Sequence, residues 1–173
     1  MTNDYLFRAL LQRSNSALRG LICSLLHLSD DDVISVEIMN PIELGKSVAA
    51  KDFFLDVKVS LNDQIVIQIG LLNYTLFPEF PEFYAVYEFR NTKNHHLYSN
   101  KLRLCVLDLS RIDLATNEDK LHRIDYWTSL FKSTTWEEIK MVASKNEFCE
   151  TLEISEIYSQ ITSKNSSGIL YPF

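Results

Sequence analysis

The sequence predicts an α/β protein of the α+β kind, with a small, mostly antiparallel central sheet of about five strands and helices at both ends of the chain. Apolar residues recur at three- and four-residue steps in 6–26, alternate with polar residues in 54–70, and regain the helical period after residue 135. The 173 residues are 46% hydrophobic with only four glycines, which suits a single domain over residues 1–173.

Two helices are predicted in residues 6–26, because a polar stretch at 13–16 interrupts the leucine-rich pattern. Ser14 or Ser16 would cap the second helix, since a serine side chain at this position accepts a hydrogen bond from the first backbone amides. The β-branched segment 33–39 then predicts the first strand.

The middle of the chain predicts the rest of the sheet. Proline and glycine punctuate a loop at 40–52, and a hairpin follows over 54–70. Two further strands are expected at 83–89 and 101–109, joined by a polar connection. Strands that are neighbours in the sequence are expected to pair antiparallel.

The C-terminal third returns to helix. Thr134 and Glu137 have the spacing of a capping box and precede an apolar helix face. A second helix is expected over 147–161, followed by a loose tail over 163–173. The large side chains expected to pack in the core are Trp127, Phe131 and Trp136.

The side-chain period of two fixes the register of the hairpin at 54–70. Its two apolar rows share one face only if Leu55 lies opposite Ile69, which needs a loop of about three residues. In that register Asp56 faces Gln68.

This pairing is close to what a metal-dependent nuclease requires. Such enzymes hold Mg²⁺ between two carboxylates on neighbouring strands, with a lysine or glutamine nearby to position the attacking water. Here an amide stands where the second carboxylate is needed. We therefore interpret Asp56, Lys58 and Gln68 as a vestigial catalytic set, in which Asp56 alone offers a weak metal ligand or none.

Several segments carry a family resemblance: "NDYLF", "NPIELG…KDFFLDVKV", "VYEFRN…YSNKLRLCVLDLSRI", "WTSLFK" and "WEEIKMVASKN". In order and spacing they resemble the recombination-promoting nuclease (Rpn-like) family of the PD-(D/E)XK superfamily. The resemblance implies a nuclease-like fold with Asp56 as the catalytic aspartate. Family members usually carry Glu-x-Gln on the second hairpin strand, whereas this chain has Gln68-Ile69-Gly70. The resemblance is therefore to a shortened, catalytically degenerate member.

The connection after the hairpin departs from the superfamily pattern, which places a helix there. Pro78 and Pro81 make a helix very unfavourable in so short a segment. Its absence would leave apolar sheet surface uncovered, and exposed apolar patches mark interfaces. The predicted contacts are Tyr74, Phe77 and Phe80, with the apolar Leu76 and Phe83 beside them.

A second candidate binding segment is basic and aromatic. It suits contact with a phosphate backbone or stacking on a base, although a polar hairpin end has the same composition. Its residues are Lys93, His95, His96, Tyr98, Lys101 and Arg103. His95 and His96, together with His122, also raise the hypothesis of a metal site or a histidine base, against the plainer interpretation of a solvated loop.

An active nuclease with a rearranged site is the main alternative to a degenerate one. Asp56 and Lys58 form a half-motif of the (D/E)xK kind, for which Glu37 or Glu43 would supply the upstream acid.

Composition limits the function classes. The net charge of −6 argues against a broad basic surface for nucleic acid and fits docking on a basic partner. No glycine-rich phosphate loop or common hydrolase motif occurs. The cysteines are scattered and no apolar stretch approaches about 18 residues, so we expect a cytoplasmic protein without a membrane span.

We therefore expect a non-catalytic binding protein on a degenerate nuclease fold, acting on a nucleic-acid-processing complex. An inhibitor such as an anti-CRISPR or other phage anti-defence protein fits this description. The expected partner is a nuclease or another nucleic-acid-processing protein, with RNA and DNA as the other direct ligands. No cofactor is expected, except that Mg²⁺ would be required if nuclease activity is retained. The alternatives are an active Mg²⁺-dependent DNA or RNA nuclease and a self-associating module that forms a homodimer.

Overall fold

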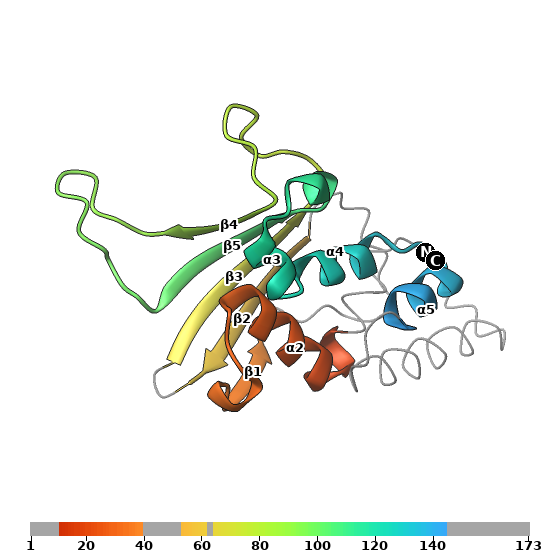
Figure 1. Ribbon diagram of the computed structural model, residues 1–173. Helices are drawn as coiled ribbons and strands as arrows, with labels where there is room; N and C mark the ends of the chain where they lie inside the picture. Colours follow the sequence, from red (N-terminus) through yellow and green to blue (C-terminus); the bar gives the residue numbers. More distant parts are fainter. Residues whose placement is uncertain (1–10, 40–52, 62–63, 145–173) are drawn as a thin grey trace, which may run out of the picture.

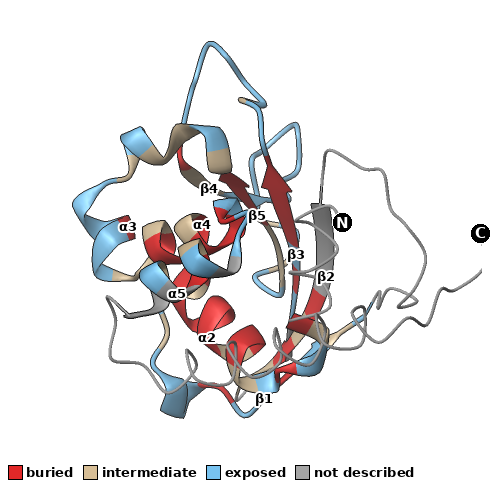
Figure 2. Cartoon of the chain, turned by 90° about the vertical axis from the view of Figure 1, so that its right-hand side faces the viewer, coloured by how far each residue is buried: buried red, intermediate tan, exposed pale blue. Residues whose placement is uncertain are grey.

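The computed structural model describes residues 11–39, 53–61 and 64–144, and within them the predicted fold class is confirmed (Figure 1). A five-stranded sheet has the strand order β1-β2-β3-β5-β4. The described helices gather against one face of this sheet, here called the inner face, and leave the opposite, outer face without a described helix (Figures 1 and 2). The loop expected at 40–52, the helix at 147–161 and the tail at 163–173 lie outside the described residues.

Each predicted strand segment contains an observed strand. The strands are β1 (Ser35–Ile38), β2 (Phe53–Ser60), β3 (Gln64–Leu72), β4 (Tyr84–Glu88) and β5 (Leu102–Asp108). The pairs β1–β2, β2–β3 and β4–β5 are antiparallel, as expected for neighbours in sequence.

β4 is the exception to the expectation that strands adjacent in sequence pair, because it does not pair with β3. β5 lies parallel to β3 and displaces β4 to the edge of the sheet. Burial explains this order, because residues 105–108 of β5 are all buried whereas most of β4 is exposed. A strand buried on both faces is stable in the centre of a sheet, and a half-exposed strand is tolerated at its edge.

Three of the described helices begin where a polar side chain accepts a hydrogen bond from one of their first backbone amides. Helix α2 (Asn15–Leu26) is capped by Ser14, one of the two serines predicted for this role, whose Oγ accepts a hydrogen bond from the backbone N–H of Ala17 at 3.0 Å. Helix α3 (Asn117–Leu121) and helix α4 (Ile124–Lys132), which contains "WTSLFK", precede helix α5 (Trp136–Ser144). Short 3₁₀ turns occupy Asp30–Asp32 and Leu109–Leu114.

The capping box of α5 lies one residue later than predicted. The helix starts at Trp136, so Thr135 and Glu138 take the positions that we expected for Thr134 and Glu137. The backbone N–H of Glu138 donates to Thr135 Oγ1 at 3.2 Å, and the Glu138 carboxylate accepts from the N–H of Thr134 at 2.6 Å and of Thr135 at 3.2 Å. Threonine at both positions makes the two frames nearly indistinguishable in the sequence.

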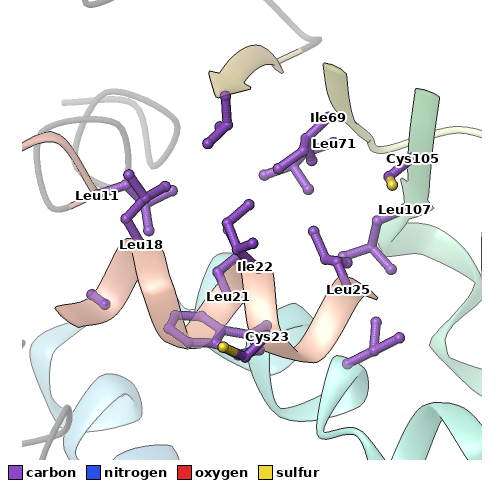
Figure 3. Packing of buried hydrophobic residues seen from close by; sticks show 14 of the residues in the cluster. Leu11, Leu18, Leu21, Ile22, Cys23, Leu25, Ile69, Leu71, Cys105 and Leu107 are labelled. Carbon is purple, nitrogen blue, oxygen red and sulfur yellow. The ribbon is translucent and has the colours of Figure 1, made fainter. Parts of the chain in front are cut away.

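The core lies between the inner face of the sheet and helices α2 and α4. Side chains of α2, including Ile22 and Leu25, face those of the sheet, including Ile69 and Leu107 (Figure 3). Trp127 of α4 contacts α2 through a hydrogen bond from its indole to Ser24, and it is 1% exposed. The core positions predicted for Trp127 and Phe131 are confirmed, and the Trp136 side chain lies outside the description. None of the described helices has the length and apolar character needed to span a membrane.

Candidate functional site

The backbone register of the β2–β3 hairpin matches the prediction. Leu55 lies opposite Ile69 and Asp56 lies opposite Gln68. The pairing continues to Ser60 and Gln64, as the predicted short loop requires. The position that faces the candidate aspartate is therefore occupied by an amide side chain, which is exposed to solvent.

The β1–β2 pairing adds one acid to this region. Glu37 lies opposite Lys58, two residues along β2 from Asp56. Glu37 is exposed and Lys58 is half-buried. Glu43, the other acid considered for a rearranged nuclease site, lies outside the described residues. The register thus places Asp56, Lys58, Gln68 and Glu37 on three neighbouring strands, with a single carboxylate position on the β2–β3 pair.

The segment between β3 and β4 contains no helix, as the two prolines predicted. Residues 73–82, here called the aromatic loop, instead fold over one end of the outer face. They enclose a cavity of about 20 Å³ with Ala85 and Val106, which alternate with the inward-facing Tyr84 and Leu107 on their strands. The Phe77 ring meets the Tyr87 ring edge-on, with centroids 6.1 Å apart. The loop is therefore held against the sheet.

The aromatic loop presents large apolar side chains to solvent. Phe80 is 79% exposed, and Tyr74, Leu76 and Phe77 are each 41–46% exposed. Phe83 was grouped with these residues in the sequence but is 2% exposed, so its predicted exposure is wrong. The carbonyl oxygen of Phe83 accepts a hydrogen bond from the Asp108 N–H at 2.9 Å, which joins this residue to the sheet and to the core cluster.

Beyond the aromatic loop, the outer face itself is only partly covered. Val66 and Tyr87 are 43% and 36% exposed, and Gln68 is also exposed. These positions continue the surface of the aromatic loop across β3, β5 and β4, because Gln68 pairs with Leu104 and Leu104 pairs with Tyr87. The loop and this row form one surface on the side of the sheet away from the described helices.

The basic and aromatic segment forms the turn between β4 and β5. Asn91 organises it: its Oδ1 accepts from the Lys93 N–H at 2.8 Å, and its own N–H donates to the His96 carbonyl at 2.9 Å. His95 has a positive φ of 59°, and Tyr98 is 77% exposed. Figure 1 shows this turn projecting from the sheet, separate from the aromatic loop.

The residues of the predicted basic and aromatic segment do not all lie in the β4–β5 turn. Lys93, His95, His96 and Tyr98 lie in the turn, and Lys101 is exposed at its end. Arg103 lies within β5 opposite Glu88, on the inner side of the sheet. It lines an open cleft rather than the turn.

That cleft was not foreseen from the sequence. It has a volume of about 470 Å³ and lies between the end of α2 and β4; its lining includes Leu25, His27, Tyr84, Glu88, Arg90 and Arg103. Arg90 Nη2 pairs with Glu88 Oε2 at 2.5 Å. The Tyr84 hydroxyl donates to the Leu25 carbonyl, and burial raises the pKa of that hydroxyl, so Tyr84 remains neutral.

His122 lies apart from His95 and His96, beside His27 and Glu118. The His27 and His122 rings stack in parallel with centroids 3.8 Å apart, and His27 Nδ1 lies 3.4 Å from Glu118 Oε1. Burial and then the neighbouring His122 lower the pKa of His27, against upward effects of Glu118 and Asp119. Two imidazoles and a carboxylate thus meet at His27, which also lines the cleft.

Comparison with known proteins adds no assignment. No family model, curated protein or solved structure matches this chain. The resemblance to the PD-(D/E)XK superfamily and the roles it implies for Asp56 therefore stay predictions.

Sequence reasoning located the hairpin and the aromatic loop but missed the His27 cluster. A partial signal was present, because Glu118 and His122 have the i, i+4 spacing that places two side chains on one face of a helix. His27 carries no local signal, since it joins the others only when α2 and α3 come together in the fold.

Proposed function

We propose that this protein is a non-catalytic binding protein that docks on a nucleic-acid-processing protein through its aromatic loop and the adjoining outer face. The observation that carries the proposal is the exposure of Tyr74, Phe77 and Phe80 on a sheet face that no described helix covers. Contiguous exposed aromatic side chains are uncommon on monomers and typical of interfaces.

The energetics favour a protein partner. Burial of an aromatic side chain contributes on the order of 1.5–3 kcal/mol, and a few such side chains at the centre of an interface dominate its affinity. Phe80 has most of its surface available for burial, and Phe77 is held by Tyr87. A side chain that is already held in place loses less conformational entropy on binding.

The charge of the loop indicates the chemistry of the partner. Glu79 and Glu82 are exposed and flank Phe80, and the whole chain carries a net charge of −6. An apolar surface bordered by carboxylates complements a groove bordered by lysine and arginine, as in proteins that bind nucleic acid. Occupation of such a groove would exclude the nucleic acid, which supports an inhibitory role of the anti-CRISPR or anti-defence kind.

The absence of catalysis in this proposal rests on Gln68. An amide opposite Asp56 supplies an oxygen without charge, and Mg²⁺ sites depend on anionic oxygen ligands. The hairpin is thus better suited to a structural role than to metal-dependent hydrolysis.

Affinity capture from the native host tests the proposal. Wild-type bait, treated with a nuclease to remove bridging nucleic acid, should retain a nucleic-acid-processing protein identified by mass spectrometry. Phe77→Ala and Phe80→Ala baits should lose it, whereas Tyr98→Ala should not, because Tyr98 is an exposed aromatic on the separate β4–β5 turn.

Three outcomes would contradict the proposal. Equal capture by the Phe80→Ala bait would remove the aromatic loop from the interface. Capture that disappears on nuclease treatment would indicate RNA or DNA as the direct ligand. A concentration-dependent dimer in light scattering that Phe80→Ala abolishes would assign the surface to self-association.

An active nuclease is the second candidate, supported by the register that places Glu37 opposite Lys58, two residues along β2 from Asp56. Cleavage of single- and double-stranded DNA and RNA in Mg²⁺ and Mn²⁺ tests it. Turnover that Asp56→Ala abolishes would establish this candidate and overturn the non-catalytic one.

A further inference from the structure

Three metal-ligating side chains converge where the end of α2 meets α3. His27 follows the last residue of α2, Glu118 lies in the first turn of α3, and His122 follows the last residue of α3. One ligand atom from each lies within 4.8 Å of the other two. Within the described part of the chain, this is the only such group of three.

The backbone on both sides of the cluster is fixed by hydrogen bonds. His27 adopts the left-handed conformation with φ of 56° and its N–H bonds to the carbonyls of Cys23 and Ser24. The N–H of His122 donates to the Glu118 carbonyl at 3.0 Å, so these two residues lie on one helical turn. The capping box of Thr116 and Asp119 closes the start of the same turn.

The separations approach those of a coordination sphere. A tetrahedral zinc ion with bonds of about 2.0–2.2 Å holds its ligand atoms about 3.3–3.6 Å apart. His27 Nδ1 and Glu118 Oε1 are already 3.4 Å apart. The two rings must tilt from their parallel stack so that their lone pairs converge, which is open to them because His27 is exposed and His122 is half-exposed.

We propose that His27, Glu118 and His122 bind a divalent transition-metal ion of the zinc class. Two imidazole nitrogens and one carboxylate oxygen suit Zn²⁺ and disfavour Mg²⁺, which prefers a sphere of oxygens. Three protein ligands leave a coordination position open, as in zinc sites that also bind water or a small ligand. This site is separate from Asp56 and goes beyond the proposed docking function.

The cleft beside His27 indicates what can occupy the open position. Arg90 and Arg103 line this cleft, and Glu88 pairs with Arg90. Positive charge next to a bound metal favours an anionic fourth ligand, such as hydroxide, carboxylate or phosphate, over a neutral one.

Metal titration of the untagged, chelator-treated full chain tests the site. Isothermal titration with ZnCl₂ should show one saturable site, and CoCl₂ should give the visible absorption of a four-coordinate cobalt ion. Glu118→Gln and His122→Gln should each raise the dissociation constant for Zn²⁺ at least tenfold. His27→Gly should do the same while tolerating the left-handed backbone at that position.

Two controls separate this site from adventitious binding. His96→Ala removes an exposed histidine from the β4–β5 turn and should leave Zn²⁺ affinity unchanged. Unchanged far-ultraviolet circular dichroism would show that the three variants are folded. Affinity in any of the folded variants equal to that of the wild type, or no saturable Zn²⁺ binding up to millimolar concentration, would overturn the proposal. Equal binding of MgCl₂ would overturn the zinc-class assignment.

Discussion

The indole Nε1 of Trp127 donates a hydrogen bond to Ser24 Oγ at 3.0 Å, joining α4 to α2 inside the core. The two residues are 103 positions apart in the chain and both are buried. A buried indole N–H needs a partner, and here a helical serine supplies it. This bond joins two helices that both contribute side chains to the core against the sheet.

Loss of the serine hydroxyl should destabilise the protein. Ser24→Ala leaves the indole N–H buried without its acceptor, which costs about 1–3 kcal/mol of unfolding free energy. Urea denaturation measures the difference. Ser35→Ala, at an exposed position of β1, should change stability by less than about 0.5 kcal/mol. Equal losses of unfolding free energy in the two variants would show that the hydrogen bond between Trp127 and Ser24 does not contribute to stability.

Phe80 and Phe83 provide a matched pair for the aromatic loop. Phe80→Ala should change the unfolding free energy by less than about 0.5 kcal/mol, because the ring is 79% exposed. Phe83→Ala should cost about 3–5 kcal/mol, since that ring belongs to the core. Thermal or urea unfolding distinguishes them, and a large loss for Phe80→Ala would mean that its ring serves the fold rather than a partner.

Restoring a carboxylate opposite Asp56 tests the interpretation of the hairpin. Gln68→Glu should strengthen Mg²⁺ binding at least tenfold, equivalent to about 1.4 kcal/mol, because the added charge lies at the paired position. Calorimetric titration measures the gain. Asp56→Asn in the Gln68→Glu background should abolish it. A gain that survives this second change would place the ion elsewhere.

The cap of α5 should give a pH-dependent contribution to stability. Hydrogen bonds from the backbone N–H of Thr134 and Thr135 lower the pKa of Glu138. A lowered folded-state pKa means that the stabilisation is fully present above the ordinary glutamate pKa of about 4.3 and is lost as the pH falls through the lowered value. Glu138→Gln should therefore be less stable than the wild type at pH 7, and this difference should disappear in acid.

Urea denaturation at a series of pH values checks this expectation through the urea concentration at the midpoint of unfolding. Glu137→Gln is the matched control, since Glu137 lies exposed in the same turn of α5. A constant gap between wild type and Glu138→Gln from pH 7 down to pH 2 would show that the Glu138 carboxylate does not cap the helix through its charge.

Local patterns explain which parts of the structure the sequence could predict. The hairpin register follows from alternation within one short segment, and the Ser14 cap follows from a polar break before a helical repeat. The absence of a helix in the aromatic loop follows from Pro78 and Pro81.

The features that sequence reasoning missed depend on contacts between distant segments. Phe83 and Phe80 have similar local sequences, but Phe83 belongs to the core cluster whereas Phe80 is exposed, and this difference arises only in the folded chain. Helix α3 is only five residues long, too short for a periodic signal. His27 meets His122 because the fold brings their helix ends together, which no local pattern encodes.

The parallel pairing of β3 with β5 joins two antiparallel groups of strands into one sheet. β1, β2 and β3 form one antiparallel ribbon, and β4 with β5 forms another, each assembled from strands that follow one another in sequence. The β3–β5 pairing is the one seam that joins them. The inner faces of both ribbons contribute side chains to one core with α2 and α4, so we expect the two ribbons to unfold together rather than separately.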